Sequence, residues 1–562
     1  MSSPSAPVRA LATVALILAV ISPPAAAEEV PVEQNPARVT VYAGPVFVTQ
    51  DPDLPEAAAV AVDHHGRVVE LYGEVPRDTE WPVVTLPGRL ALPGLCDAHL
   101  HVSGIGRLRE QVSLRGCRSP QEAAARVQAF AAAHPELPVI QGRGWDQSLF
   151  PGRRFPTAAD LDGVCDRPVI LRRVDGHAAW VNRAALRAAG ISAATPDPAG
   201  GRLLRDAAGA PLGVLVDNAL DLLDGVVPPP DDATRERWLL AGLNACADAG
   251  LTAVHDMGES PAVADVAQRL ADAGRLPIRL FVYLEGSVPG AVAALDRYHD
   301  APRFAVVGVK SYADGALGSR GAALLADYGD DPGNRGLLVT DPDTLRARMA
   351  AVHRRGFQNA VHAIGDRANR LVLDIVADIQ HGDTSRRHRV EHAQVVAPDD
   401  FPRFRELGVI ASMQPTHATS DMRWAEQRLG PQRVLGAYAW RTMRDLGVPL
   451  AFGSDAPVEN WDPLPGIYAA VTRQDKSGWP PGGWYPAQRL TDAEAVAAFT
   501  TGAAYAVHRE GELGRLSRGY LFDVTVLDRD PRGRPAQWLA ARVTAVVVGG
   551  EVVRRIGPPG RR

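Results

Sequence analysis

Hydrophobic segments divide the chain into a β-rich beginning, a long repetitive middle and a β-rich end. Near the beginning, four short segments rich in β-branched residues lie between turn-forming residues, at 39–48, 58–62, 68–72 and 83–86. A similar pattern returns near the end, at residues 524–528, 543–548 and 552–553. Gly549 and Gly550 separate the last two segments, as in a hairpin turn. Because chain ends often lie close together, we expect both regions to form one composite β-sandwich domain.

The middle of the chain repeats an apolar strand, a loop and an amphipathic helical segment. Eight strand candidates follow this pattern, at residues 92–101, 251–257, 278–284, 304–310, 359–362, 388–392, 409–414 and 450–455. Helical periodicity is found between or after them, for example over residues 345–355, 370–378 and 491–502. Eight strands alternating with helices predict an α/β fold with a TIM-like (β/α)8 barrel. The alternative is an open doubly wound sheet, but no Gly-x-Gly-x-x-Gly turn follows any of these strands.

One connection is much longer than the others, because the segment from His101 to Leu251 exceeds an ordinary barrel connection. We therefore predict an insertion after barrel strand 1, over about residues 110–245, which lies above the active-site end of the barrel. The predicted domains are a barrel over residues 91–512 and a composite β domain built from residues 28–90 and 513–562.

Residues 1–27 have the pattern of a secretory signal peptide. Arg9 supplies a positive charge, residues 10–21 are apolar but short for a membrane span, and Ala25 to Ala27 offer a cleavage site. An uncleaved anchor is the alternative. No later run is apolar enough to span a bilayer, so we expect an exported protein, periplasmic or secreted, without a stable membrane span after cleavage.

Composition changes this picture in three respects. The net charge of −5 and the lack of a basic stretch with interleaved aromatics argue against a nucleic-acid partner. Lys310 and Lys476 are the only lysines among 60 lysines and arginines, so 58 of these residues are arginine. A lysine kept in such a chain is a candidate for chemistry that arginine cannot perform. The four cysteines show no Cys-x-x-Cys spacing, and a Cys117–Cys165 disulfide stays open as a candidate.

Six residues with metal-binding or proton-transfer chemistry stand at the C-terminal ends of predicted strands. They are His99, His101, Lys310, His362, His392 and Asp455. Residues i and i+2 of an extended strand point to the same face, so both histidines of the first strand can reach one point. A single histidine at a strand end is usually structural. The whole set, however, provides ligands for one or two divalent ions and leaves a position for water.

Seven motifs together resemble a known family. They are residues 93–101 (PGLCDAHLH), 144–147 (GWDQ), 175–182 (DGHAAWVN), 308–320 (GVKSYADGALGSR), 361–366 (VHAIGD), 390–393 (VEHA) and 452–457 (FGSDAP). In this order they resemble the amidohydrolase superfamily, and specifically its family 3 branch of metal-dependent hydrolases, which includes the N-substituted formamide deformylases. The resemblance covers nearly the whole mature chain but says little about the substrate.

The resemblance implies roles for these residues. His99 and His101 would hold one divalent ion, and His362 and His392 would hold a second where one is present. Asp455 would contact the first ion and act as the general base, passing a proton from water to the leaving nitrogen. Zinc is the first expectation, with manganese, iron and nickel as alternatives.

Lys310 matches the position whose lysine is carboxylated in many members of this superfamily. The resulting carbamate would bridge two metal ions. A lysine amine can lose its proton when it is buried near a dication, whereas an arginine guanidinium stays protonated. The alternative is a lysine that forms a salt bridge.

Several other residues are candidates for substrate contacts. His177 would donate a hydrogen bond to the substrate carbonyl, or else it anchors the insert against Trp180. Trp145 and Trp180 would line a pocket, or else they belong to the core. Arg320 would bind a substrate carboxylate, with a simple ion pair as the alternative.

Four residues near the predicted metal ligands complete these expectations. Asp97, between the ligands of the first strand, is interpreted either as a support for the metal ligands or as structural. Glu391 is expected on the opposite face of its strand from its neighbour in the metal set. For His255 and His417 we expect substrate-side or structural roles.

We therefore expect an enzyme that hydrolyses a C–N bond in a small non-peptide amide, of the N-acyl or N-formyl amine type. One alternative is a hydrolase of a lactone or an N-acyl amino acid on the same scaffold. Another is a non-catalytic exported binding protein, which would be expected to have lost some of the ligands. A homodimer is compatible with the sequence.

Overall fold

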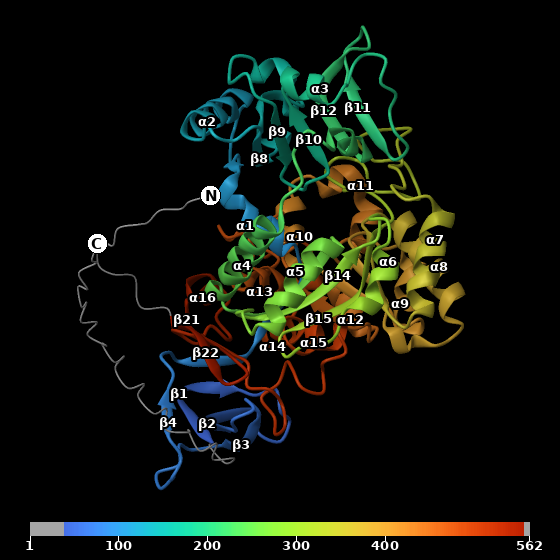
Figure 1. The fold of residues 1–562 in the computed structure, drawn as a ribbon. Coiled ribbons are helices and arrows are strands. Elements are labelled where there is room, and N and C mark those ends of the chain that lie inside the picture. The colour runs from blue at the N-terminus through green and yellow to red at the C-terminus, as the bar shows by residue number, and fades with distance from the viewer. Residues whose placement is uncertain (1–38, 556–562) are drawn as a thin grey trace, which may run out of the picture.

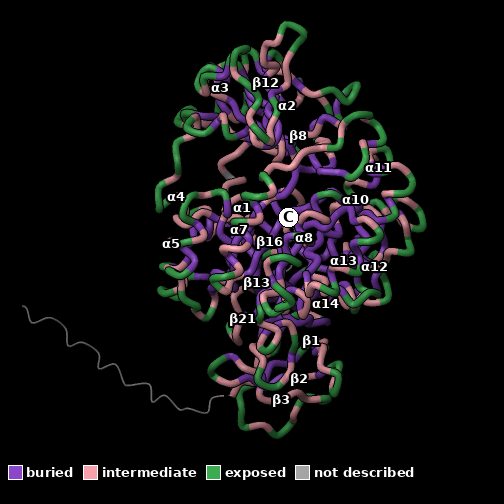
Figure 2. The backbone as a smooth tube through the Cα atoms, turned by 90° about the vertical axis from the view of Figure 1, so that its right-hand side faces the viewer, coloured by how far each residue is buried: buried purple, intermediate pink, exposed green. Residues whose placement is uncertain are grey.

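The computed structural model describes residues 39–555, so the predicted signal peptide lies outside the described residues and export stays a prediction. In Figure 1 the insert lies at the top, the barrel in the middle and a β domain at the bottom. Buried segments, drawn in purple in Figure 2, concentrate around the barrel strands β13 (Leu251–Glu259) and β16 (Gln358–Ala363). Among the helices of residues 39–555, none is both long and apolar enough to cross a membrane.

Eight parallel strands form the barrel, which confirms the predicted TIM-like fold. Besides β13 and β16, these are β6 (Leu95–Leu100), β14 (Arg279–Glu285), β15 (Phe304–Tyr312), β17 (Arg389–His392), β18 (Ile410–Met413) and β19 (Leu450–Phe452). Neighbours in the chain are also neighbours in the sheet, from β6 through β13 to β19. A parallel bridge between Leu100 and Ala456 joins the first strand to the segment after the last one and closes the barrel.

Helices between the strands begin where side chains cap them. α5 (Pro261–Asp272) starts with a proline, and Ser260 accepts the amide hydrogen of Val263. Asp341 caps α7 (Pro342–Arg354) in the same way, whereas α8 (Asp366–Gln380) has no side-chain cap. The predicted helix at 491–502 is divided into α14 (Asp492–Ala498) and α15 (Thr501–Ala506). The break lies at Thr500, whose backbone is not helical and whose hydroxyl donates to Val496 O.

The predicted first barrel strand is divided between two sheets. Residues Leu90–Pro93 form β5, which pairs with β20 (Val524–Leu527), and β6 begins only after Gly94. A Cβ atom at Gly94 would lie 2.2 Å from Thr252 Oγ1, so only glycine allows the chain to pass here. The strand thus leaves the β domain and enters the barrel within one residue.

Strands from both chain ends join one eight-stranded sheet, as the similar patterns at the two ends predict. Its order is β22-β21-β20-β5-β1-β2-β3, and β4 also pairs with β1. The remaining bounds are β1 (Thr40–Val48), β2 (Glu56–Val62), β3 (Val68–Tyr72), β4 (Val83–Thr85), β21 (Val543–Val548) and β22 (Glu551–Arg555). Phe47 and Val60 share a hydrophobic cluster with Val524 and Val547, so the sheet encloses its own core as two layers of a sandwich would.

The insert contains a third sheet, of six strands. Its order is β11-β12-β10-β9-β8-β7, with bounds β7 (Val112–Ser113), β8 (Ile140–Trp145), β9 (Val169–Arg173), β10 (Ala178–Val181), β11 (Gly201–Arg205) and β12 (Pro211–Asp217). Helices α2 (Pro120–Ala133) and α3 (Arg183–Ala188) belong to this part, while α4 (Asp232–Asp248) packs on α1 (Val102–Arg107) and α5 of the barrel. All four cysteines are free thiols, so the candidate Cys117–Cys165 disulfide is absent.

Candidate active site

A cavity of about 520 Å³ lies at the C-terminal ends of the barrel strands, beneath the insert. All six predicted strand-end residues line it: His99, His101, Lys310, His362, His392 and Asp455. The insert supplies part of the opposite wall through Arg143, Asp146, Arg173 and His177. The cavity therefore joins the barrel chemistry to residues of a separate sheet.

Three of these side chains offer ligand atoms that lie within 4.8 Å of one another, namely His99, His392 and Asp455. His101 Nε2 lies 3.1 Å from Asp455 Oδ1, and Lys310 Nζ lies 3.3 Å from His99 Nε2. The ring of His362 is centred 4.6 Å from that of His392. The strand ends thus bring imidazole nitrogens, a carboxylate and an amine around one point.

Hydrogen bonds at Nδ1 fix the orientation of two histidine rings. His99 Nδ1 lies 2.6 Å from Glu391 Oε2, and His392 Nδ1 lies 2.8 Å from Gln414 Oε1. With Nδ1 of each ring engaged in this way, Nε2 is the nitrogen left to act as a ligand. A set of imidazole nitrogens and a carboxylate oxygen, held by outer hydrogen bonds, fits a divalent metal ion.

The expectation that Glu391 points away from the metal-ligand side of its strand is wrong. Its buried carboxylate contacts His99 and also accepts from Arg389 Nε at 2.8 Å. The alternation of the strand ends at His392, which has a left-handed φ of 73° and lines the active-site cavity, whereas Glu391 does not line it. Burial raises the pKa of Glu391, but Arg389 and His99 hold it far below its usual range.

Asp455 and Asp97 connect the first and last barrel strands. Asp455 has a φ of 57°, and its amide donates to His99 O at 2.6 Å. Burial raises the pKa of Asp455, but hydrogen bonds with His101 and His99 hold it well below its usual range, so the carboxylate is ionised. Asp97 accepts from the amides of His99 and Ser454, both at 3.0 Å, which is the structural role expected for it.

His177 faces the cavity from the insert and is held by Asp217. Its Nδ1 lies 2.9 Å from Asp217 Oδ1, and its ring is centred 5.4 Å from that of His362. Burial lowers the pKa of His177, but Asp217 and Asp175 more than offset this and hold it above its ordinary value. The raised pKa favours the protonated form of the ring, which can donate a hydrogen bond into the cavity. Asp217, at the end of β12, was not anticipated because its pairing depends on the insert sheet.

Three predicted substrate contacts lie elsewhere. Trp145 and Trp180 are fully buried in the core of the insert, and their indole nitrogens donate to Leu171 O and Thr157 O. Neither tryptophan lines the cavity. Arg320 does not line it either, because its Nη2 forms an ion pair with Asp330 at 3.0 Å. The simple alternatives, core packing and an ion pair, describe these three residues.

Two further histidines differ in position. His417, just after the seventh barrel strand, lines the cavity, stacks on His392 and places Nε2 3.7 Å from Asp455 Oδ2. Its place after a strand end was the signal that linked it to the substrate side. His255 is buried under the site and lies 3.0 Å from Arg389 Nη1, which is a structural position.

The chain is similar to known proteins over most of its length. The model of a family described as "Amidohydrolase family" matches residues 83–554. A putative amidohydrolase, YtcJ of Bacillus subtilis, is 34% identical over 87% of this chain and 92% of its own length. The N-substituted formamide deformylase of Arthrobacter pascens is 27% identical over 83% of this chain and 88% of its own length. A solved structure of an uncharacterized metal-dependent hydrolase from Pyrococcus horikoshii OT3 covers 89% of this chain and 99% of its own, with 27% identity and a TM-score of 0.73.

Proposed function

The chain belongs to the amidohydrolase family, and from this membership and the geometry of the cavity we propose that it hydrolyses the C–N bond of a small non-peptide amide. The observation that carries the proposal is the convergence of six strand-end side chains on one cavity. The ligand set is complete, which disfavours a non-catalytic binding protein. A relative named as an N-substituted formamide deformylase supports an N-acyl or N-formyl amine as the substrate.

The chemistry of these side chains supports named residues as the ligands of a metal ion. In this proposal His99, His101, His362, His392 and Asp455 hold one or two divalent ions, with zinc as the first candidate. A bound divalent ion supplies Lewis acidity, which polarises a carbonyl group and lowers the pKa of a water molecule.

Two protein side chains have separate roles in this reaction, one in proton transfer and one in stabilising the carbonyl oxygen. Asp455 is ionised and lies 3.1 Å from His101, so it can accept a proton from the attacking water and pass it to the leaving nitrogen. His177, whose pKa is raised by Asp217, can in its protonated form donate a hydrogen bond to the carbonyl oxygen, where negative charge develops. The two groups come from the barrel and the insert, so a substrate amide is held between these two parts.

Lys310 is proposed to be carboxylated. Its Nζ is buried, and among residues 39–555 no carboxylate lies within ion-pair distance of it. Burial lowers the pKa of this amine, which favours the neutral form that adds to carbon dioxide. The new N–C bond forms with release of one proton to water, and the product is an anionic carbamate beside His99.

Metal analysis and a substrate panel test this proposal. We expect the purified wild-type chain to contain divalent metal and to hydrolyse members of a panel of N-acyl and N-formyl amines, with loss of activity after chelation and recovery after metal is restored. Lys310→Arg is expected to lose most of its metal and activity. The exposed Lys476 provides the matched control, and Lys476→Arg should behave as the wild type.

Two results would contradict these proposals separately. Full metal content and activity in Lys310→Arg would rule out the carbamate while leaving the amide reaction intact. Hydrolysis of lactones with no hydrolysis of any amide in the panel would instead overturn the choice of bond.

A further inference from the structure

A second cavity, of about 400 Å³, lies beside the active-site cavity at the junction of the insert and the barrel; we name it the side pocket. Four residues line both cavities: Gly104, Arg143, Gly176 and Pro457. The two cavities therefore adjoin at these residues.

Three arginines from separate elements line the side pocket. Arg107 comes from α1, Arg143 from β8 and Arg172 from β9. The parallel register of β8 and β9 places Arg143 beside Arg172, with both side chains on the face that also carries Gln141 and Ile170. Like charges placed side by side on neighbouring strands repel each other, so this arrangement costs stability unless an opposite charge lies between them.

The protein supplies little opposite charge. Among the described residues, no carboxylate lies within ion-pair distance of Arg107, Arg143 or Arg172, and Asp224 is the one acidic residue that lines the pocket. Arg143 Nη2 donates to Val174 O at 3.2 Å, while the Nε atoms of Arg107 and Arg143 are buried without a hydrogen-bond partner. A buried guanidinium nitrogen without an acceptor is costly.

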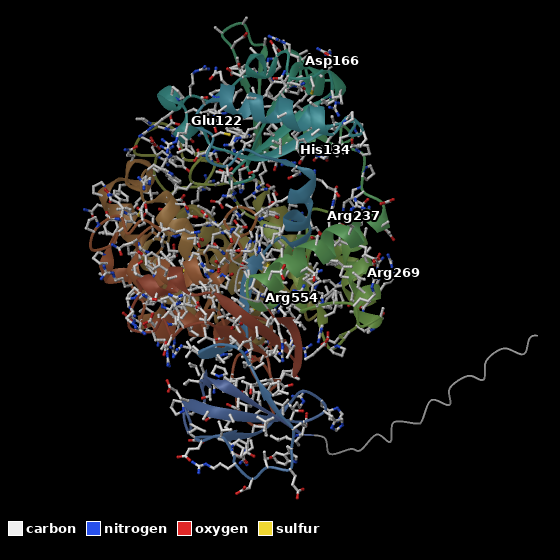
Figure 3. The ribbon with its side chains drawn as sticks, turned by 90° about the vertical axis from the view of Figure 1, so that its left-hand side faces the viewer. Glu122, His134, Asp166, Arg237, Arg269 and Arg554 are labelled. Carbon is white, nitrogen blue, oxygen red and sulfur yellow. The ribbon has the colours of Figure 1, made fainter. Side chains whose placement is uncertain are left out.

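Other arginines nearby have acidic partners. Figure 3 shows Arg237 and Arg269 on the outer surface, where Arg237 pairs with Glu110 at 3.0 Å and Arg269 pairs with Asp232 at 2.8 Å. Acidic partners are thus common in this region of the fold. The side pocket therefore differs from its surroundings in having few acidic partners for its arginines.

Desolvation and mutual repulsion both act on these side chains. Burial lowers the pKa of Arg143 to about 10; Arg115 lowers it further, whereas Asp455 opposes the shift. Arg172 is exposed, yet desolvation by nearby protein atoms and repulsion from Arg107 lower its pKa to about 10, with Asp224 and Asp221 opposing the shift. Both groups still carry their charge at neutral pH, so the pocket holds a net positive charge. Guanidinium groups match the oxygens of carboxylates and phosphates.

We propose that the side pocket binds an anionic group of the substrate, a carboxylate or a phosphate, while the scissile amide lies in the adjoining cavity. The identity of the amide rests on the proposed function, whereas the binding of an anion does not. Arg143 is the residue between the two cavities, and Arg107 and Arg172 complete the site. This proposal gives the enzyme a preference for charged amides that the metal ligands alone do not provide.

A binding experiment tests the anion site without any turnover. Inorganic phosphate and acetate are titrated separately into the full chain by calorimetry, in a buffer free of other multivalent anions. We expect at least one of them to bind the wild type, and Arg172→Gln to weaken that binding about tenfold or more. Arg202 is an exposed arginine on β11 that lines neither cavity, so Arg202→Gln is the matched control and should bind as the wild type.

Stability measurements guard against a folding artefact. In anion-free buffer Arg172→Gln should keep or raise the melting temperature, because it removes one of the repelling charges. Phosphate or acetate should then raise the melting temperature of the wild type more than that of the variant. A variant that is folded and binds both anions as tightly as the wild type would overturn the proposal.

A kinetic experiment connects the pocket to the substrate. Pairs of amides that differ only in a terminal carboxylate or phosphate against a neutral carboxamide are compared by kcat/KM. We expect the wild type to prefer a charged member, and Arg143→Gln or Arg172→Gln to reduce that preference about tenfold or more. Preference for the carboxylate or the phosphate tells which anion the pocket selects.

Equal kcat/KM for charged and neutral members in the wild type would overturn the proposal. Hydrolysis of no amide would instead overturn the proposed function, and the titrations would then decide whether the side pocket binds an anion.

Discussion

The active-site cavity and the side pocket meet at Arg143, yet their polar groups are supported differently. In the active-site cavity three histidine rings are each hydrogen-bonded at Nδ1. The partners are Glu391 for His99, Gln414 for His392 and Asp217 for His177. In the side pocket, by contrast, Arg107 and Arg143 keep buried nitrogens without acceptors. The first set of contacts fixes the direction of each ring before any ligand arrives.

The two cavities therefore bind their ligands on different grounds: one through rings that are already oriented, the other through charges that have no partner. A histidine ring whose Nδ1 is hydrogen-bonded keeps its orientation. The residue that accepts this hydrogen bond therefore contributes to metal binding although it touches neither metal nor substrate. Arginines without partners contribute through the ligand that neutralises them. Changes among the supporting partners of the active-site cavity should therefore alter catalysis, whereas changes at arginines that already have acidic partners should alter little.

The largest effect is expected at Asp455, the one carboxylate among the six strand-end groups. Asp455→Asn keeps the size of the side chain but cannot take up a proton, so kcat should fall by about 10²–10⁴-fold. Steady-state kinetics on the best amide of the panel measure this effect. Asp399→Asn, at an exposed position outside both cavities, is the control. Full activity of Asp455→Asn would remove this residue from the proposed mechanism.

A smaller effect is expected at Glu391, which tests whether its hydrogen bond to His99 Nδ1 contributes to metal binding. Glu391→Gln removes the charge that holds His99 and leaves the buried Arg389 without its anionic partner. Metal affinity should fall about 10–100-fold, as measured by competition with a chelator, and the melting temperature should fall as well. Glu406→Gln, at the exposed end of α9 (Phe401–Glu406), is the matched control. Unchanged metal affinity would mean that the contact with His99 is incidental.

The smallest effect is expected at Arg320, an arginine that already has an acidic partner. Arg320→Gln breaks a partly exposed ion pair with Asp330, so stability should change by about 0–1 kcal/mol. Activity on charged and neutral amides should stay at the wild-type level, in contrast to the side-pocket arginines. Denaturant unfolding and kcat/KM measure the two quantities. A selective loss of activity on charged amides would return Arg320 to the list of substrate contacts.

The barrel and its strand-end residues were predictable because their signals are local. Each strand is a short apolar run that ends in a polar residue, and parallel strands of a closed barrel present their C-terminal ends at one face. The positions of His362 and His392 at the ends of β16 and β17 follow from this rule.

Other features depend on contacts that no local pattern contains. The contact of Glu391 with His99 joins two barrel strands, and the left-handed backbone at His392 breaks the alternation from which the direction of the Glu391 side chain was inferred. The pairing of Arg143 with Arg172 depends on the register of two insert strands. Apolar bulk alone does not separate a cavity wall from a core, which is why Trp145 and Trp180 were expected at the cavity.

The contact between Asp97 and Ser454 has a consequence for how the protein matures. These residues are 357 positions apart, and their hydrogen bond joins the two ends of the barrel at the point where Asp455 meets His99. The last strand must dock before those two groups can share a ligand, so a chain still emerging from the ribosome has no complete site until the end of the barrel has been made. Uptake of metal is then a late event that reports a finished barrel, and the bound ion would in turn favour the closed form over a frayed one.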